Sequence, residues 1–192
     1  VLRFDEVVIH SSNIGMALIG ARMGNALLFK SLKDFGFGSR CGIDLPGEHV
    51  GLLLPLHRWT EYSTASIPMG QEIASTAIQL VTAFAALANH GMLLRPRVVR
   101  GIIDENGRIA EDLSLPFPRR RVVDVATADY MVRHVLSNVV NNGTGHRAAL
   151  PNHQVFGKTG TAQLLDPDGR YSHEHYASSF LGGIPASDPQ LV

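Results

Sequence analysis

The chain has 192 residues, of which 45% are hydrophobic and 18% are charged, values typical of a globular protein rather than a disordered segment. Its 17 basic and 17 acidic residues give a formal net charge of zero, which argues against a general nucleic-acid binder because such proteins usually carry a basic face. The only cysteine, Cys41, has no partner for a disulfide or a cysteine-based metal site. No apolar run approaches the roughly 20 residues of a membrane-spanning helix.

The first predicted helix covers residues 13–35 and consists of two pieces. Ser11 or Ser12 can cap its start, because a hydroxyl there accepts a hydrogen bond from a first-turn amide. Gly24 and Asn25 interrupt the pattern. The first piece has an apolar stripe made of Ile14, Ala17, Leu18 and Ala21, and the second has one made of Leu28, Leu32 and Phe35.

The middle of the chain alternates between loop and regular structure. Residues 39–70 are rich in glycine and proline, which predicts a loop-rich segment. A helix is expected over about 72–90, stopped by Gly91. Residues 94–103 then read as a strand, and the Asp-Glu-Asn-Gly sequence at 104–107 predicts a hairpin turn.

One more helix precedes the last third of the chain. It is predicted over about 127–140 and closed by the Asn/Gly-rich residues 141–145. Its core candidates are Tyr130, His134, Val135 and Leu136.

The last third is predicted to be a strand–turn–strand unit. Residues 155–165 form an apolar strand, the Asp-Pro-Asp-Gly sequence at 166–169 is a strong turn signal, and residues 176–184 return as a second strand. Residues 190–192 begin another strand. Because a sheet cut there leaves backbone groups of its neighbour unpaired, we expect both ends of the chain to lie inside a larger domain.

Two short motifs carry the chemistry. Lys158-Thr159-Gly160-Thr161 lies on the predicted strand 155–165, and Lys-Thr-Gly on a strand is a signature of the serine penicillin-recognising enzymes. A second signature, Ser-x-Asn, occurs as Ser11-Ser12-Asn13 at the start of a helix. The nucleophile motif, Ser-x-x-Lys, is absent. The residues three positions before the lysines Lys30, Lys33 and Lys158 are Leu27, Lys30 and Val155.

Longer strings make the chain resemble class B penicillin-binding proteins along nearly its whole length. These strings are Ser11–Met16, Phe35–Gly38, Gly42–Glu48, Met69–Gln71 with the helix after it, Ala88–Gly91, Gly143–Gly145 and Gly157–Gln163. The stretch Asp166–Tyr171 is similar to the division-specific, FtsI-like branch. The resemblance implies an α/β fold, with an antiparallel sheet flanked by helices and a helical subdomain beside it. Residues 1–192 would be part of one transpeptidase domain, truncated at both ends.

The same resemblance implies a D,D-transpeptidase that cross-links peptidoglycan stem peptides through a serine acyl-enzyme. Its ligands would be D-Ala-D-Ala peptides and β-lactams, and its partners other division or cell-wall synthesis proteins. Neither a metal, an organic cofactor nor nucleic acid is expected. The whole protein would face the periplasm, anchored in the bacterial cytoplasmic membrane by a segment outside this chain.

Residue roles follow from the family motifs. Ser11 would bridge the two motif lysines and relay a proton to the leaving amine, and Asn13 would hold substrate backbone and the first-motif lysine. Lys158 would supply positive charge near the terminal carboxylate of the substrate. Thr159 and Thr161 would bind that carboxylate through their hydroxyls, and the small Gly160 would let substrate lie against the strand. The Thr161 amide would be one oxyanion-hole donor.

Simpler interpretations stand beside these. Ser11 and Asn13 are also suited to cap a helix, Lys158 to protect a strand edge, and the two threonines to form an ordinary strand. Gly143 and Gly145 are interpreted as turn residues. His173 and His175 have metal-ligand spacing but no third ligand nearby, which favours a loop.

Two other functions remain open at this point. A serine β-lactamase or D,D-carboxypeptidase has the same motifs but uses water to resolve its acyl-enzyme. A non-catalytic β-lactam sensor is a binding module of the same superfamily.

Overall fold

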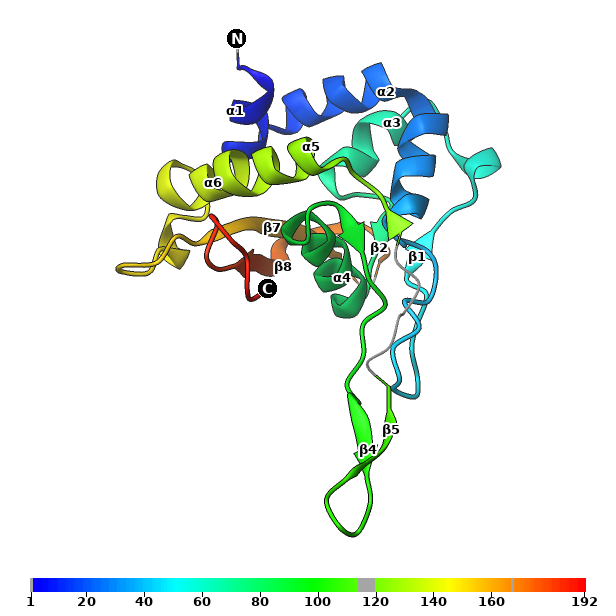
Figure 1. The fold of residues 1–192 in the computed structure, drawn as a ribbon. Coiled ribbons are helices and arrows are strands. Elements are labelled where there is room, and N and C mark those ends of the chain that lie inside the picture. Colours follow the sequence, from blue (N-terminus) through cyan, green and yellow to red (C-terminus); the bar gives the residue numbers. More distant parts are fainter. Residues whose placement is uncertain (1, 114–119, 167) are drawn as a thin grey trace.

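Helices form one layer of the molecule, the long hairpin β7–β8 lies against it, and a second, thinner hairpin projects away from both (Figure 1). The computed structural model describes residues 2–113, 120–166 and 168–192. Its α-helices are α1 (Phe4–Ile9), α2 (Asn13–Asp34), α3 (Ser63–Ser66), α4 (Ala77–Ala88), α5 (Val125–Tyr130) and α6 (Ser137–Asn142). A π-helical segment, η3 (Met131–Leu136), joins α5 to α6, and short 3₁₀ turns are η1 (Leu56–Arg58), η2 (Ile67–Met69) and η4 (His146–Ala148).

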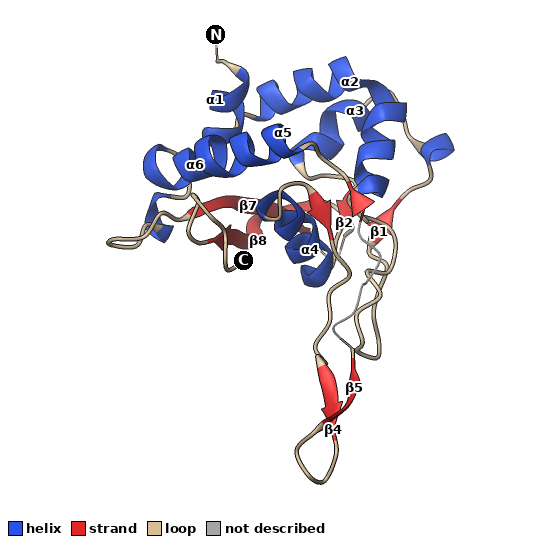
Figure 2. Cartoon of the chain, viewed as in Figure 1, coloured by secondary structure: helices blue, strands red, loops and turns tan. Residues whose placement is uncertain are grey.

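The described strands all pair as antiparallel hairpins or short ladders (Figure 2). They are β1 (Leu52–Leu53), β2 (Ile73–Ala74), β3 (Met92–Leu93), β4 (Gly101–Ile103), β5 (Ile109–Asp112), β6 (Arg120–Arg121), β7 (Phe156–Leu165) and β8 (Tyr171–Gly183). β7 pairs with β8 in a register that places Lys158 opposite Leu181 and Thr161 opposite Ser178. The predicted strand–turn–strand unit is therefore confirmed, although β8 begins at Tyr171 rather than Tyr176, because its first residues are too polar to give an apolar strand signal.

The main core lies where the α5–η3–α6 helix, α4 and β7 meet. Its buried residues are Val132, Leu136, Phe156 and Ala186, with Phe84, Leu87 and Ala88 packed against them. Phe156 is completely buried and stacks on Phe84, with 5.7 Å between the ring centroids. The predicted core positions Val135 and Leu136 are confirmed.

Two other predicted core residues are on the outside. Tyr130 is 47% exposed and His134 is also exposed, so their assignment to the core was wrong. Their rings lie 5.3 Å apart, side by side on the solvent face of the helix. The apolar neighbours of these residues turn inward instead.

Helix α2 has the predicted two pieces, because Gly24 interrupts it with φ 75° and ψ 161°. Leu28, in the second piece, is buried. In the first piece, Ile14 and Leu18 are 78% and 67% exposed, so this apolar stripe does not face the core formed by the described residues.

The predicted helix 72–90 was too long at its start. Ile73 and Ala74 form β2, and Thr76 then caps α4 in a capping box with Gln79. The cause lies in Glu72, whose φ is 60° and whose carboxylate accepts hydrogen bonds from the hydroxyls of Ser63 and Ser66. This contact turns the chain before the helix can begin.

The predicted strand 94–103 was wrong over most of its length. Asp44 accepts hydrogen bonds from the backbone N–H groups of Val98 and Val99 at 2.7 and 2.8 Å, so a side chain takes the place of a strand partner. Beyond this point β4 and β5 form the arm, a hairpin that projects from the body as the turn sequence predicts (Figure 1). At the C-terminal end, Leu191 makes only an isolated bridge to Ile184.

Candidate active site

Ser11 lies in the tight turn between α1 and α2. It has a left-handed backbone conformation, with φ 53°. The neighbouring Ser12 caps α2, because its hydroxyl accepts a hydrogen bond from the Gly15 N–H at 3.2 Å. The cap is thus supplied by Ser12, which leaves the Ser11 hydroxyl available for another contact.

Lys158 makes that contact. Its ammonium donates hydrogen bonds to the Ser11 hydroxyl and, at 3.0 Å, to the Thr159 carbonyl oxygen. The buried Phe156 fixes the start of β7 two positions earlier, so the lysine projects from a rigid strand. Partial burial of the ammonium holds the pKa of Lys158 below its ordinary value, because desolvation disfavours the charged form.

All six site residues predicted from the sequence line one cavity of about 760 Å³. They are Ser11, Asn13, Lys158, Thr159, Gly160 and Thr161. Consecutive residues of a strand point to opposite faces, so a cavity lined by Lys158–Thr161 runs along the edge of β7. That edge is open, since β7 pairs with β8 alone among the described strands. The structure brings these residues together, and their individual roles stay predictions.

The cavity continues over an apolar floor. This floor includes Val7, Met16, Phe84 and Leu136, which reach it from four different helical segments. Pro68, Met69 and Gly70 close another side. Polar groups suited to bind a ligand therefore lie beside an apolar wall, a combination typical of ligand sites.

Thr144 is a site residue that the sequence interpretation missed. It lines the same cavity, and its hydroxyl oxygen lies 2.7 Å from that of Thr159. The available signal was its position between Gly143 and Gly145, which were interpreted as turn residues. Both glycines do hold the chain in place. A Cβ on Gly143 would lie 2.4 Å from the carbonyl oxygen of Ile9, and the N–H of Gly145 donates to the Val139 carbonyl.

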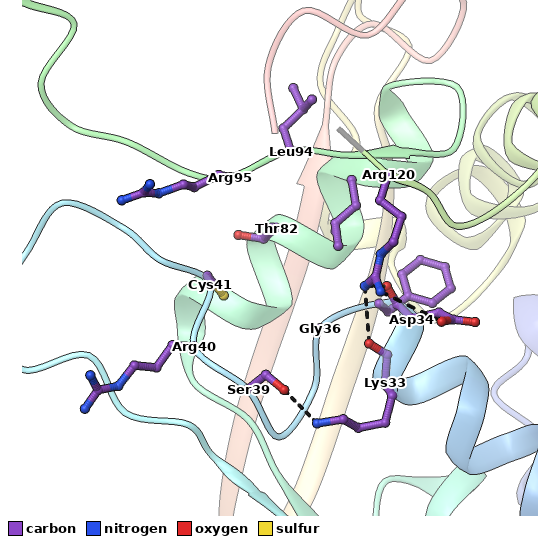
Figure 3. A pocket seen from close by; sticks show the side chains of 12 residues that line it. Lys33, Asp34, Gly36, Ser39, Arg40, Cys41, Thr82, Leu94, Arg95 and Arg120 are labelled. Atoms are coloured by element: carbon purple, nitrogen blue, oxygen red, sulfur yellow. Dashed lines mark hydrogen bonds and ion pairs between the residues drawn. The ribbon is translucent and has the colours of Figure 1, made fainter. Parts of the chain in front are cut away.

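A second cavity, of about 550 Å³, lies beside Cys41 and contains none of the predicted site residues. Three of its charged side chains, Lys33, Asp34 and Arg120, are paired within the fold (Figure 3). Lys33 donates to the Ser39 hydroxyl at 2.6 Å, and Arg120 donates to the Lys33 carbonyl oxygen at 3.3 Å and lies 3.9 Å from the Asp34 carboxylate. Burial raises the pKa of the Cys41 thiol, which disfavours the reactive thiolate. We therefore place the chemistry in the first cavity.

The histidine spacing does not produce a metal centre in the part of the chain that is described. No group of three or more His, Cys, Asp or Glu residues there is arranged to hold an ion. The His175 ring nitrogen lies 3.7 Å from the Asp166 carboxylate, and the side chain of His173 is outside the described set. Both histidines belong to β8, so the prediction of a loop at these positions was wrong. Among the described helices, none combines the length and apolarity needed to cross a bilayer.

Comparison with known proteins agrees with this geometry. The family model described as the penicillin binding protein transpeptidase domain matches residues 1–192. Stage V sporulation protein D of Bacillus subtilis is 40% identical over 187 residues, covering 97% of this chain and 29% of that protein. Peptidoglycan D,D-transpeptidase FtsI of Escherichia coli is 28% identical over 197 residues, covering 100% of this chain and 31% of that protein.

Solved structures give the same result. The crystal structure of penicillin-binding protein 3 from Mycobacterium tuberculosis, complexed with ampicillin, superposes with a TM-score of 0.88 at 35% identity, covering 96% of this chain and 42% of that one. The fold is thus the α/β transpeptidase fold that the motifs predict. The chain spans about a third of the length of the curated relatives it matches. It belongs to the penicillin-binding protein transpeptidase domain family.

Proposed function

We propose that the protein containing this chain is a D,D-transpeptidase that cross-links peptidoglycan stem peptides. The observation that carries the proposal is the contact between the Lys158 ammonium and the Ser11 hydroxyl. A strand lysine and a helix-start serine from opposite ends of the sequence meet in one cavity. A structural role for each residue alone, as a helix cap or an edge-strand lysine, gives no reason for them to meet.

The nucleophile comes from outside these 192 residues, because no Ser-x-x-Lys occurs in them. Residues 1–192 are accordingly one part of a larger transpeptidase domain. The apolar floor beside Ser11 supports the proposal of a larger domain, because another apolar element of that domain can pack against it. Helix α2 has a second such apolar surface, formed by the exposed side chains of Ile14 and Leu18.

The chemistry then proceeds in two steps. The serine oxygen attacks the carbonyl carbon between the two D-alanines, and the carbon–nitrogen bond breaks to give an ester, the acyl-enzyme. The proton that the serine hydroxyl loses passes to the leaving amine, and Ser11 relays it under the influence of the Lys158 charge. The amine of a second stem peptide attacks the ester, forms the cross-link and releases the serine.

Substrate lies along the open edge of β7. Gly160 leaves room for the peptide backbone, and the hydroxyls of Thr159 and Thr161 bind the terminal carboxylate. The Thr161 N–H stabilises the oxyanion, a contribution whose loss costs about 3–4 kcal/mol in comparable sites. Asn13, also in the cavity, holds the substrate backbone. A β-lactam with its own carboxylate fits the same place, which agrees with the ampicillin bound by the M. tuberculosis relative.

The name of the Bacillus subtilis relative favours a role in sporulation, and the similarity of the stretch 166–171 to the division-specific, FtsI-like branch favours a role in cell division. The proposed partners are other division or cell-wall synthesis proteins. The proposed location is the outer face of the cytoplasmic membrane, with an anchor in a part of the protein outside this chain.

The test is acylation by a fluorescent penicillin. The complete protein should form a stable covalent adduct and should transfer a D-Ala-D-Ala donor to an amine acceptor. The 192-residue chain alone should form no adduct. Absence of an adduct on the complete protein contradicts the proposal. Rapid hydrolysis of the penicillin instead identifies a β-lactamase, and release of free D-alanine without transfer identifies a carboxypeptidase.

A further inference from the structure

We propose that Thr144 is a positioning residue, which makes the Thr159 hydroxyl donate its proton toward the ligand carboxylate. The inference rests on the proposed function, because it concerns how that site binds a carboxylate. It adds a third threonine hydroxyl to those of Thr159 and Thr161, one that belongs to the loop after α6 rather than to β7.

The geometry gives the direction of each hydrogen bond once a carboxylate is bound. The two hydroxyl oxygens lie 2.7 Å apart, and either can be the donor. A hydroxyl has one proton and two lone pairs, whereas an ionised carboxylate only accepts. If Thr159 donates its proton to the carboxylate, the hydrogen bond between the threonines must use the proton of Thr144. Thr144 therefore donates to Thr159, and Thr159 donates to the ligand.

This arrangement strengthens the contact with the ligand in two ways. A hydroxyl that already accepts a hydrogen bond is polarised and becomes a better donor. In addition, the Thr159 hydroxyl no longer has to give up rotational freedom when the ligand arrives, so the site is preorganised.

The loop is built to hold Thr144 in this position. Gly143 approaches the Ile9 carbonyl so closely that a Cβ would lie 2.4 Å from the oxygen. On the other side of Thr144, Gly145 is buried, and its N–H donates to Val139 at 2.9 Å. Thr144 itself is exposed on the cavity wall. A hydroxyl presented to a cavity by two tightly packed neighbours is poorly explained by a role in stability alone.

The reverse order of hydrogen bonds makes a different prediction. In that order Thr159 donates to Thr144, and Thr144 contacts the ligand directly. Loss of the Thr144 hydroxyl would then be at least as damaging as loss of the Thr159 hydroxyl. In the order proposed here, Thr159 makes the contact and Thr144 strengthens it, so the Thr159 variant suffers more.

The experiment measures the second-order acylation rate of the complete protein with a penicillin. The variants are Thr144→Val, Thr144→Ser, Thr159→Val and the double variant T144V/T159V. We expect Thr144→Val to lose about fivefold and Thr159→Val about thirtyfold, as for loss of a neutral and of a charge-assisted hydrogen bond. Thr144→Ser should recover most of the wild-type rate, and the double variant should be no slower than Thr159→Val.

Two controls separate positioning from stability. With a penicillin methyl ester, which has no ionised carboxylate, Thr144→Val and wild type should react at rates within about twofold of each other, because the charge-assisted contact is absent. Thr64→Val removes a threonine hydroxyl that donates to Glu61 outside the cavity, and it should not change acylation.

The outcomes are separable. An unlabelled wild-type protein contradicts the proposed function. A labelled wild type with an equally fast Thr144→Val overturns the inference, as does an equal loss with the methyl ester. Additive losses in the double variant, or a larger loss for Thr144→Val than for Thr159→Val, also overturn it, because Thr144 would then act on its own.

Discussion

In the cavity lined by Ser11 and Lys158, here called the cleft, polar side chains are supported by buried residues, whereas in the arm apolar side chains lie on strands exposed to solvent. Lys158 follows the fully buried Phe156 by two residues. Ile103, in β4, is 67% exposed, and every residue of β4 and β5 is exposed. The cleft is therefore held by packing from several elements, and the arm by its own turn and a few polar contacts.

This difference shows that the cleft and the arm owe their rigidity to different contacts. A two-stranded hairpin without a covering layer is marginally stable in water. Just before the arm begins, the Asp44 carboxylate accepts hydrogen bonds from the Val98 and Val99 amides. The cleft needs fixed distances for its chemistry, and the arm does not. Changes in the cleft should alter acylation, and changes in the arm should leave it alone.

The largest expected effect comes from removing the cleft charge. Lys158→Met should slow acylation by at least about a hundredfold, because both roles proposed for the ammonium, in proton relay and in carboxylate attraction, would be lost. Lys158→Arg keeps the charge but changes its shape, so an intermediate loss is expected. The measurement is the acylation rate of the complete protein. A loss below tenfold for Lys158→Met would contradict the proposed role of the Lys158 charge in acylation.

The acylation rates of wild type and Lys158→Arg should depend differently on pH. Burial lowers the pKa of Lys158, and the proposed mechanism needs the positive charge of this side chain. The wild-type rate should therefore fall as the pH rises through a value below that of ordinary lysine. Lys158→Arg should lack this fall, because arginine stays charged.

The next largest effect is expected on the free energy of unfolding, when a core side chain and an arm side chain are each replaced by alanine. Phe156→Ala removes a fully buried ring that stacks on Phe84, and the free energy of unfolding should drop by about 3–5 kcal/mol. Ile103→Ala should change it by no more than about 0.5 kcal/mol, because an exposed side chain loses little contact. Denaturant unfolding of both variants tests the comparison, and similar losses would mean that the arm is packed in solution.

The sequence was sufficient for the elements that depend on local patterns. The α2 break at Gly24, the turn of the arm and the β7–β8 hairpin all follow from glycine, turn residues and periodicity. The errors at 72–76 and 94–100 have a different origin. In each, a carboxylate from a distant or strained position, Asp44 or Glu72, takes over backbone or hydroxyl groups that a pattern cannot assign.

The residues of the site likewise include some that the sequence predicts and one that it does not. Ser11 and Lys158 could be found because each belongs to a motif with its own chemistry. Thr144 was missed, because the Gly143–Gly145 string, although part of the family resemblance, was interpreted as an ordinary turn. Its value depends on the close approach of Gly143 to Ile9 and on the position of Thr159 across the cavity. Only the folded chain contains that information.

A smaller effect should come from two matched glycine substitutions. Gly143→Ala forces a Cβ against the Ile9 carbonyl, so the loop must move and acylation should slow by about tenfold, as for misplacement of a group near a reacting centre. Gly107→Ala, at the turn of the arm, has φ +75° and no atom within 4 Å of the added Cβ. It should cost about 1–2 kcal/mol of local backbone strain and leave acylation unchanged. Equal acylation rates for the two variants would contradict the division between cleft and arm.

The smallest effect concerns the Asp44 contact just before the arm begins. Asp44→Asn should speed hydrogen exchange at the Val98 and Val99 amides, since a neutral amide oxygen accepts more weakly than a carboxylate. These two N–H groups hold the pKa of Asp44 below its ordinary value. The carboxylate therefore stabilises the contact above its unfolded pKa, and this contribution is lost as the pH falls through the lower, folded value. Exchange in the wild type, corrected for intrinsic rates, should thus approach that of Asp44→Asn in acid, while acylation at neutral pH is the same in both. Exchange that stays different at low pH would show that the amides are protected by something other than the Asp44 charge.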